Sequence, residues 1–203
     1  MNKTINIFGD SITWGACDEM GGWANRLRNY LGKDPVNYSK VCNLGVSGNN
    51  SDDLLKRFNS ENQARNPNII MIAIGVNDSQ YINSKDNPRV TLEKFENNLL
   101  ELIVQAKKFT EEIIFVGLTI VDESKVMPIP WDKTKYYDNE NTVIYDAKIK
   151  EVAKNNNLHF IEMNDLLTED DLEDGLHPNS KGHEKMFLRI KDFLIDNKIV
   201  YKL

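Results

Sequence analysis

Short apolar runs alternate with longer stretches in which apolar residues recur every three or four positions. The runs cover residues 4–8, 68–75, 112–118 and 158–163, and another lies within 38–46. Runs of four to eight apolar residues predict buried strands, whereas three- and four-residue spacing predicts amphipathic helices. The alternation of the two predicts an α/β fold, in which helices cover both faces of a parallel sheet.

The strand at 68–75 is expected at the centre of that sheet. Its sequence NIIMIAIG is continuously apolar and rich in isoleucine, as a parallel strand buried on both faces should be. Helices are expected on either side of it in the chain, each with one apolar face. They are predicted at 23–31, from about Ser51, at 92–106 and from about Ser180.

Residues 119–141 interrupt the alternation. The segment TIVDESKVMPIPWDKTKYYDNEN contains two prolines, one tryptophan and two tyrosines, and it is longer than an ordinary connection between elements. Two interpretations stay open. The segment is either a lid or wall over a binding site, or an ordered loop packed by its own aromatic side chains.

The length and composition of the chain are typical of one soluble domain over residues 1–203. The hydrophobic share is 40% and the charged share 28%, and the net charge of −6 is spread along the chain. That charge argues against nucleic acid or an anionic membrane as the main partner, because both are anionic and bind most strongly to a basic patch. No apolar span approaches the roughly 18 residues that a membrane helix needs, and the start lacks a secretion signal. We therefore expect a cytoplasmic protein without stable membrane insertion.

The two cysteines and two of the three histidines suggest no chemistry of their own. Cys17 and Cys42 have no C-x-x-C spacing, and two thiols in a chain of this length are expected to be unpaired and buried. His159 starts a predicted strand and His183 lies on the last predicted helix, so both are expected to be structural.

Polar residues follow four of the predicted strands, where ligands bind in an open parallel sheet. Gly9-Asp10-Ser11 follows the first strand, NLGVSGNNSDD (43–53) the second, GVNDS (75–79) the third, and DGLHP (174–178) comes after the fifth. We expect these four segments to share one edge of the sheet.

Together these segments contain what nucleophilic acyl transfer requires. The Ser11 hydroxyl would attack a carbonyl, His177 would remove its proton, and Asp174 would orient the imidazole. The oxyanion would be stabilised by the Ser11 amide, the Gly48 amide and the Asn77 side chain. The acid and the histidine then lie on one loop, three residues apart.

Each segment alone has an ordinary alternative. Gly-Asp-Ser is typical of a helix N-cap turn, and Asn77-Asp78 is typical of an Asx-turn that leaves a strand. The pair Asp174 and His177 also fits a surface ion pair or half of a metal site.

The order and spacing of the four segments resemble those of the SGNH, or GDSL, hydrolase family, which is named for its Ser, Gly, Asn and His blocks. The resemblance spans almost the whole chain. FGDSIT supplies Ser11, NLGVSGNNSDD supplies Gly48 rather than Gly45, GVND supplies Asn77, and DGLHP supplies Asp174 and His177.

This resemblance implies a fold and an activity. The fold is a three-layer α/β/α sandwich with a flavodoxin-like, five-stranded parallel sheet in the order 2-1-3-4-5. The activity is hydrolysis of carboxylic esters through an acyl-enzyme, without a metal or an organic cofactor.

The substrate expected is a small or short-acyl ester, for example an acetyl group on a sugar. An acyltransferase, a lysophospholipase, a thioesterase and a binding module without catalysis are the alternatives, and the oligomeric state stays open. Trp131, Tyr136 and Tyr137 of the 119–141 segment are expected to form a substrate wall, with Asp10 as a further contact.

Overall fold

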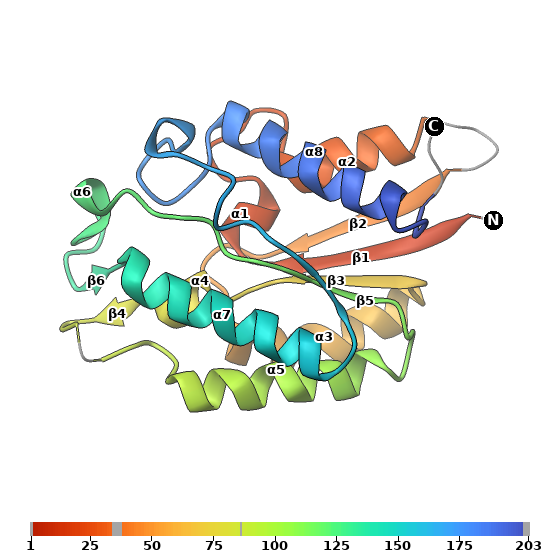
Figure 1. Ribbon diagram of the computed structural model, residues 1–203, viewed down its shortest axis with the longest axis horizontal. Coiled ribbons are helices and arrows are strands. Elements are labelled where there is room, and N and C mark those ends of the chain that lie inside the picture. The colour runs from red at the N-terminus through yellow and green to blue at the C-terminus, as the bar shows by residue number, and fades with distance from the viewer. Residues whose placement is uncertain (1, 34–37, 86, 201–203) are drawn as a thin grey trace.

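The centre of the structure, a computed structural model that describes residues 2–33, 38–85 and 87–200, is a parallel sheet (Figure 1). Its five strands lie in the order β2-β1-β3-β5-β7. This order confirms the predicted arrangement, with β5 and β7 as the fourth and fifth strands of the sequence. The strands are β1 (Lys3–Gly9), β2 (Ser39–Gly45), β3 (Ile69–Ala73), β5 (Ile113–Val116) and β7 (His159–Ile161).

Helices cover both faces of the sheet, which confirms the three-layer architecture (Figure 1). On one face α2 (Gly22–Leu31) packs against α8 (Ser180–Asp196) and β2, with the short α1 (Ser11–Trp14) beside them. On the other face α3 (Ser51–Arg65), α5 (Leu92–Ala106) and α7 (Asn139–Asn155) pack in a row. The short helices α4 (Val76–Ser79), α6 (Glu123–Val126) and the 3-10 turn at Glu169–Asp171 lie in connections.

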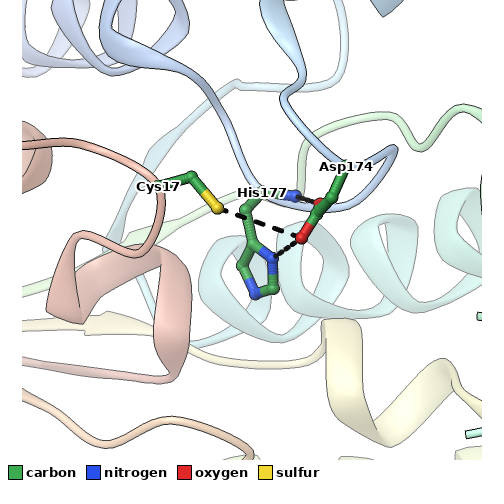
Figure 2. Close-up of side chains that lie close together, drawn as sticks. All are labelled: Cys17, Asp174 and His177. Carbon is green, nitrogen blue, oxygen red and sulfur yellow. Dashed lines mark hydrogen bonds and ion pairs between the residues drawn. The ribbon is translucent and has the colours of Figure 1, made fainter. Parts of the chain in front are cut away.

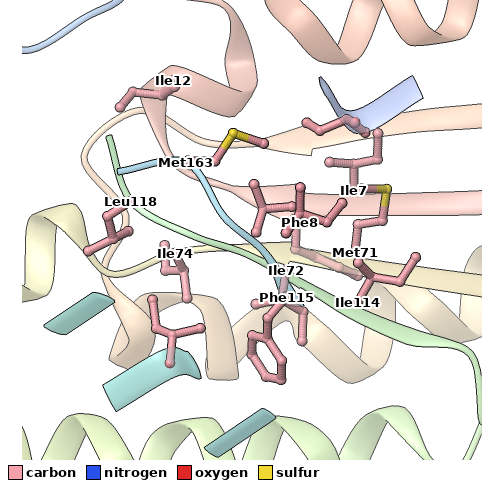
Figure 3. Close-up of a cluster of buried hydrophobic side chains, with 14 of the residues drawn as sticks. Ile7, Phe8, Ile12, Met71, Ile72, Ile74, Ile114, Phe115, Leu118 and Met163 are labelled. Atoms are coloured by element: carbon pink, nitrogen blue, oxygen red, sulfur yellow. The ribbon is translucent and has the colours of Figure 1, made fainter. Parts of the chain in front are cut away.

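The core consists of the sheet's apolar side chains and the helix faces that cover them (Figure 3). Ile7, Phe8 and Ile72 are fully buried, as the continuous apolar runs predicted. The ring of Phe58 on α3 lies 4.6 Å from that of Phe8, centroid to centroid. This contact joins α3 to the middle of the sheet.

Three neighbouring strands end level with one another in small residues. Gly9 is paired with Gly45 of β2 on one side and with Ala73 of β3 on the other. A Cβ on Gly9 would collide with the Thr13 side chain, and one on Gly45 would collide with the Trp14 backbone. The small residues therefore let α1 turn directly onto the end of the sheet.

Helix α7 is the main element that the sequence analysis missed. Val143 and Ile144 are exposed although apolar, while Asn141 and Asp146 are buried although polar. The apolar residues therefore surround the helix, and the one-faced pattern that predicts an amphipathic helix is lost.

The 119–141 segment is ordered and contains two short elements. It includes α6, and its Lys135–Tyr136 strand, β6, forms an antiparallel pair with β4 (Tyr81–Ile82). A two-residue strand has no periodicity that a sequence pattern can reveal.

Among the described residues, no helix combines the length and the apolar character needed to cross a membrane. The single domain and the cytoplasmic location stay predictions.

Truncation of Phe58 tests whether the contact between α3 and the sheet carries the stability of the fold. We expect Phe58→Ala to lower the free energy of unfolding by about 3–5 kcal/mol in urea denaturation, because a fully buried ring is lost. Val104→Ala on the exposed face of α5 is the control, with an expected change within about 0.5 kcal/mol. Equal losses in the two variants would contradict this account of the core.

Candidate active site

Ser11 lies where β1 ends and α1 begins. Asp10 caps this helix, its carboxylate accepting a 2.9 Å hydrogen bond from the Ile12 amide, and Gly15 ends it at a φ of 100°. Ser11 is the first residue of the helix, so its own N–H has no acceptor within the helix. The turn therefore presents the hydroxyl and the amide of one residue at the sheet edge.

A hydrogen-bonded chain connects Ser11 with the loop before α8. The Oγ atom of Ser11 lies 2.9 Å from Nε2 of His177, and Nδ1 of His177 lies 2.7 Å from Oδ2 of Asp174. Figure 2 shows Asp174 and His177 side by side on that loop. Because a carboxylate only accepts hydrogen bonds, Nδ1 of a neutral His177 carries the proton and Nε2 accepts from the serine hydroxyl.

The other carboxylate oxygen of Asp174, Oδ1, stabilises the loop that carries Asp174 and His177. Oδ1 accepts hydrogen bonds from the amides of Leu176, at 3.0 Å, and His177, at 2.8 Å. Burial acts to raise the pKa of Asp174, but the hydrogen bonds from His177 and the two amides outweigh it and lower the pKa to about 2. The carboxylate is therefore ionised over the whole neutral range and able to stabilise a protonated imidazole.

Gly48 lies in the connection between β2 and α3 and lines the same cleft as Ser11. Its φ of 77° is in the left-handed region, which glycine adopts without strain. No atom lies within 4 Å of the position that a Cβ would take. The requirement for glycine at this position is therefore conformational, and the backbone stays open toward the cleft.

Both ends of the Asn77 carboxamide are bonded, which fixes its orientation. Its Nδ2 donates to the carbonyl of Asn49 at 2.9 Å, and its Oδ1 accepts from the hydroxyl of Tyr137 at 2.8 Å. Because an amide NH2 has two hydrogens, one N–H of Asn77 is left for a ligand in the cleft.

A buried carboxylate beside Asn77 connects α4 with α3. Asp78 accepts hydrogen bonds from the amide and the hydroxyl of Ser51, and that hydroxyl accepts one from Asn98 at 2.8 Å. Burial raises the pKa of Asp78 to about 7, against the opposing hydrogen bonds from Ser51. Asp78 is thus held near Asn77 by neutral partners, and no cationic side chain among the described residues is hydrogen-bonded to it.

These residues line one cleft of about 260 Å³, which contains Ser11, Gly48, Asn77 and His177. Trp131 of the 119–141 segment forms part of its wall, with its ring stacked at 6.1 Å from the ring of His177. The remaining wall combines apolar and polar side chains, among them Gln80, Arg89, Ile129, Lys135, Tyr137 and Leu176. The segment is therefore a wall of the cleft.

The four residues named for substrate contact from the sequence differ in their position. Trp131 and Tyr137 line the cleft, although Tyr137 is buried and is bonded to Asn77. Tyr136 does not line it, because it lies in β6 opposite Tyr81. Asp10 does not line it either, because its side chain is buried as the cap of α1.

Several cleft residues had no signal in the sequence. Arg89 and Lys135 belong to none of the four polar segments. They line the cleft because the folded loops that carry them pass beside it. The contact of Tyr137 with Asn77 crosses sixty positions of the chain, and no local pattern predicts such a contact. Asn49, next to Gly48, contributes only its backbone carbonyl, which accepts the hydrogen bond from Asn77. Any residue provides such a carbonyl, so the sequence gives no signal for this contact.

The cysteines are unpaired, as predicted, but Cys17 is exposed. Its thiol lies beside Asp174 and His177, with Sγ 3.9 Å from Oδ2 of Asp174 (Figure 2). Partial burial and the negative charges of Asp174 and Glu173 raise the pKa of Cys17. The thiolate is therefore disfavoured, and Cys17 is a poor nucleophile on its own.

The other two histidines lie outside the cleft. His183 is fully buried, with Nδ1 accepting from the Trp23 amide and Nε2 donating to the Ala16 carbonyl at 3.1 Å. His159 is partly exposed, and its Nε2 lies 3.5 Å from a carboxylate oxygen of Glu112.

Comparison with known proteins gives one family match and several relatives. The model of the GDSL-like lipase/acylhydrolase family matches residues 7–185. The isoamyl acetate-hydrolyzing esterase 1 homolog of Mus musculus is 25% identical over 212 residues, covering 96% of this chain and 82% of that protein. The acetylxylan esterase of Geobacillus stearothermophilus is 25% identical over 164 residues, covering 74% and 71%.

The structure also resembles solved structures. The lipase/acylhydrolase from Enterococcus faecalis superposes with a TM-score of 0.77 and 26% identity, over 96% of each chain. The similarity thus extends over almost the whole of both chains.

The pH dependence of stability tests the buried state of Asp78. Its pKa of about 7 exceeds the ordinary 3.8, so between these values the folded protein holds a proton that the unfolded chain releases. Stability from this group is therefore present at low pH and lost as pH rises toward 7, by at most about 1.4 kcal/mol per pH unit. Burial also raises the pKa values of Asp10 and Asp146 to about 6, and both groups titrate in either protein. Urea unfolding at pH 4.5 to 7.5 should therefore show a steeper fall of stability with pH in the wild type than in Asp78→Asn. Parallel profiles would contradict the prediction.

Proposed function

The chain belongs to the GDSL-like lipase/acylhydrolase family and is a carboxylic ester hydrolase of that type, and we propose that Ser11, His177 and Asp174 are its catalytic triad. The observation that carries the proposal is the hydrogen-bonded chain from the Ser11 hydroxyl through His177 to Asp174. It supports nucleophilic catalysis because a serine hydroxyl needs a base within hydrogen-bonding distance, and the base needs a group that orients it.

Acylation starts at the Ser11 hydroxyl. Oγ attacks the ester carbonyl as its proton passes to Nε2 of His177, 2.9 Å away. Asp174, ionised at neutral pH, stabilises the imidazolium through Nδ1–H. The imidazolium then gives its proton to the leaving alcohol, and the acyl group stays on Ser11 as an ester.

The tetrahedral oxyanion is stabilised by three N–H donors in this proposal. They are the amides of Ser11 and Gly48 and the N–H of Asn77 that is not bonded to Asn49. The donors are preorganised, because Gly48 stands in its required backbone conformation and the Asn77 amide is fixed at both ends. Such donors need no rearrangement when the charge develops.

Deacylation repeats these steps with water. His177 accepts a proton from the water that attacks the acyl-enzyme, and Ser11 recovers its proton when the carboxylic acid leaves. The same oxyanion donors serve both half-reactions.

We infer that the substrate is a short-acyl ester of a polar alcohol, such as an acetylated sugar. A cleft of about 260 Å³ has room for a small acyl group and one ring but not for a long acyl chain. Gln80, Arg89 and Lys135 offer polar contacts to hydroxyl groups, and Trp131 offers a flat apolar surface to a sugar ring. Two relatives are named for acetate ester hydrolysis, which agrees with this substrate class.

A panel of p-nitrophenyl esters tests the triad and the chain length together. We expect Ser11→Ala and His177→Ala each to lower kcat by several orders of magnitude on p-nitrophenyl acetate, because the triad acts as a unit. Thr134→Ala, on the exposed part of the wall segment, is the matched control and should retain activity. Hydrolysis that survives in Ser11→Ala would refute the assignment, and equal turnover of acetate and octanoate esters would refute the short-acyl substrate.

Substitutions at Asn77 and Tyr137 test the oxyanion donors. We expect Asn77→Ala to lower kcat by about 10²- to 10³-fold with little change in KM, because a donor to the transition state is lost. Tyr137→Phe removes only the bond that orients the amide, so a smaller loss of about three- to tenfold is expected. A decrease below tenfold in Asn77→Ala would mean that Asn77 is only a turn residue.

A further inference from the structure

Three different metal-binding side chains meet beside Ser11. The Cys17 thiol, the Asp174 carboxylate and the His177 imidazole each offer one ligand atom, and these atoms lie within 4.8 Å of one another (Figure 2). Thiolate, carboxylate and imidazole are the three side-chain ligand types that zinc uses in proteins. The chain approaches the cluster from two distant segments, the turn after α1 and the loop before α8.

We propose that Cys17, Asp174 and His177 bind a zinc-type divalent cation, and that this binding reversibly switches off the esterase. Oδ2 of Asp174 lies between the other two ligands, 2.7 Å from Nδ1 of His177 and 3.9 Å from Sγ of Cys17. Ligands around a tetrahedral zinc ion are about 3.3–3.6 Å apart. Binding therefore requires Asp174 and His177 to separate by roughly 0.6–0.9 Å, which replaces their hydrogen bond by two metal bonds, and the exposed Cys17 side chain to approach Asp174 by roughly 0.3–0.6 Å.

A second observation concerns the surroundings of Cys17. Of the three proposed ligands, Cys17 lines a groove of about 500 Å³, and Glu19 and Glu173 also line it. Neither acid is paired with a cation among the described residues. Lys181 also lines the groove and is directed to the buried Asp171, at 3.5 Å. The groove therefore provides negative charge beside Cys17 and space for water as a fourth ligand.

Metal binding and catalysis exclude each other at His177. Binding at Nδ1 requires that the Nδ1 proton move to Nε2, and the thiol of Cys17 releases its proton to solvent. Nε2 then carries a hydrogen and can no longer accept the proton of Ser11. The inhibition rests on the proposed roles of His177 and Asp174, whereas the metal binding itself does not.

Calorimetric titration of metal-free protein with zinc chloride tests the binding without any ester. We expect one site per chain in the wild type, and binding weakened by more than about 100-fold in Cys17→Ser and in His177→Ala, because each loses a direct ligand. Cys42→Ser, which removes the other free cysteine, is the matched control and should bind like the wild type. Cobalt(II) in place of zinc should give a thiolate charge-transfer band that is absent only in the variants that lack a ligand. Wild-type affinity in Cys17→Ser, or a cobalt spectrum without that band, would overturn the site.

Ester hydrolysis tests the consequence. Zinc should inhibit the wild type and Cys42→Ser at the concentrations that saturate the calorimetric site, EDTA should restore full activity, and Cys17→Ser should resist. Magnesium at the same concentration should not inhibit, because it avoids thiolate ligands. Zinc saturation without inhibition would overturn the switch. If the metal-free protein hydrolysed no ester, the proposed function would fail instead, and the calorimetric and cobalt results would still decide the metal site.

Discussion

The level pairing of β2, β1 and β3 is the constraint on which the candidate site depends. Gly45, Gly9 and Ala73 end these strands side by side, and their small side chains leave room for α1 to turn onto the sheet edge. The segments that follow the three strands therefore start from one line, with Ser11, Gly48 and Asn77 a few residues beyond it. A larger residue in place of Gly9 or Gly45 would collide with α1 and so displace Ser11, even with every residue of the candidate site unchanged.

The remaining groups are placed by hydrogen bonds between distant segments. The buried side chain of His183 binds the Ala16 carbonyl and so joins α8 to the turn that carries Cys17. Tyr137 brings the 119–141 segment onto Asn77. Both contacts fix polar groups inside the protein, where an unpaired polar atom is costly. The site is therefore a property of the whole fold, although its chemistry uses only short loops.

The sequence predicted the parallel sheet and the meeting of four polar segments, because buried strands and strand ends have strong local patterns. The strand order followed only from the family resemblance, since no local pattern specifies which strands are neighbours. The sequence failed at α7, where apolar residues surround the helix and the polar Asp146 is buried. It also predicted Tyr136 in the substrate wall and Asp10 as a further substrate contact, but neither side chain lines the cleft. A sequence shows which residues are aromatic or acidic, but not where their side chains point. The contacts of Tyr137 and Cys17 join segments more than fifty residues apart, and such contacts follow only from the packed structure.

The central claim is that this edge of the sheet activates one serine. Labelling with a fluorophosphonate, followed by peptide mass spectrometry, tests it most directly, because only an activated nucleophile is phosphonylated. The account predicts one adduct per chain, on Ser11, and its loss in His177→Ala. An adduct on Cys17 or on another serine, or undiminished labelling of Ser11 without His177, would contradict it.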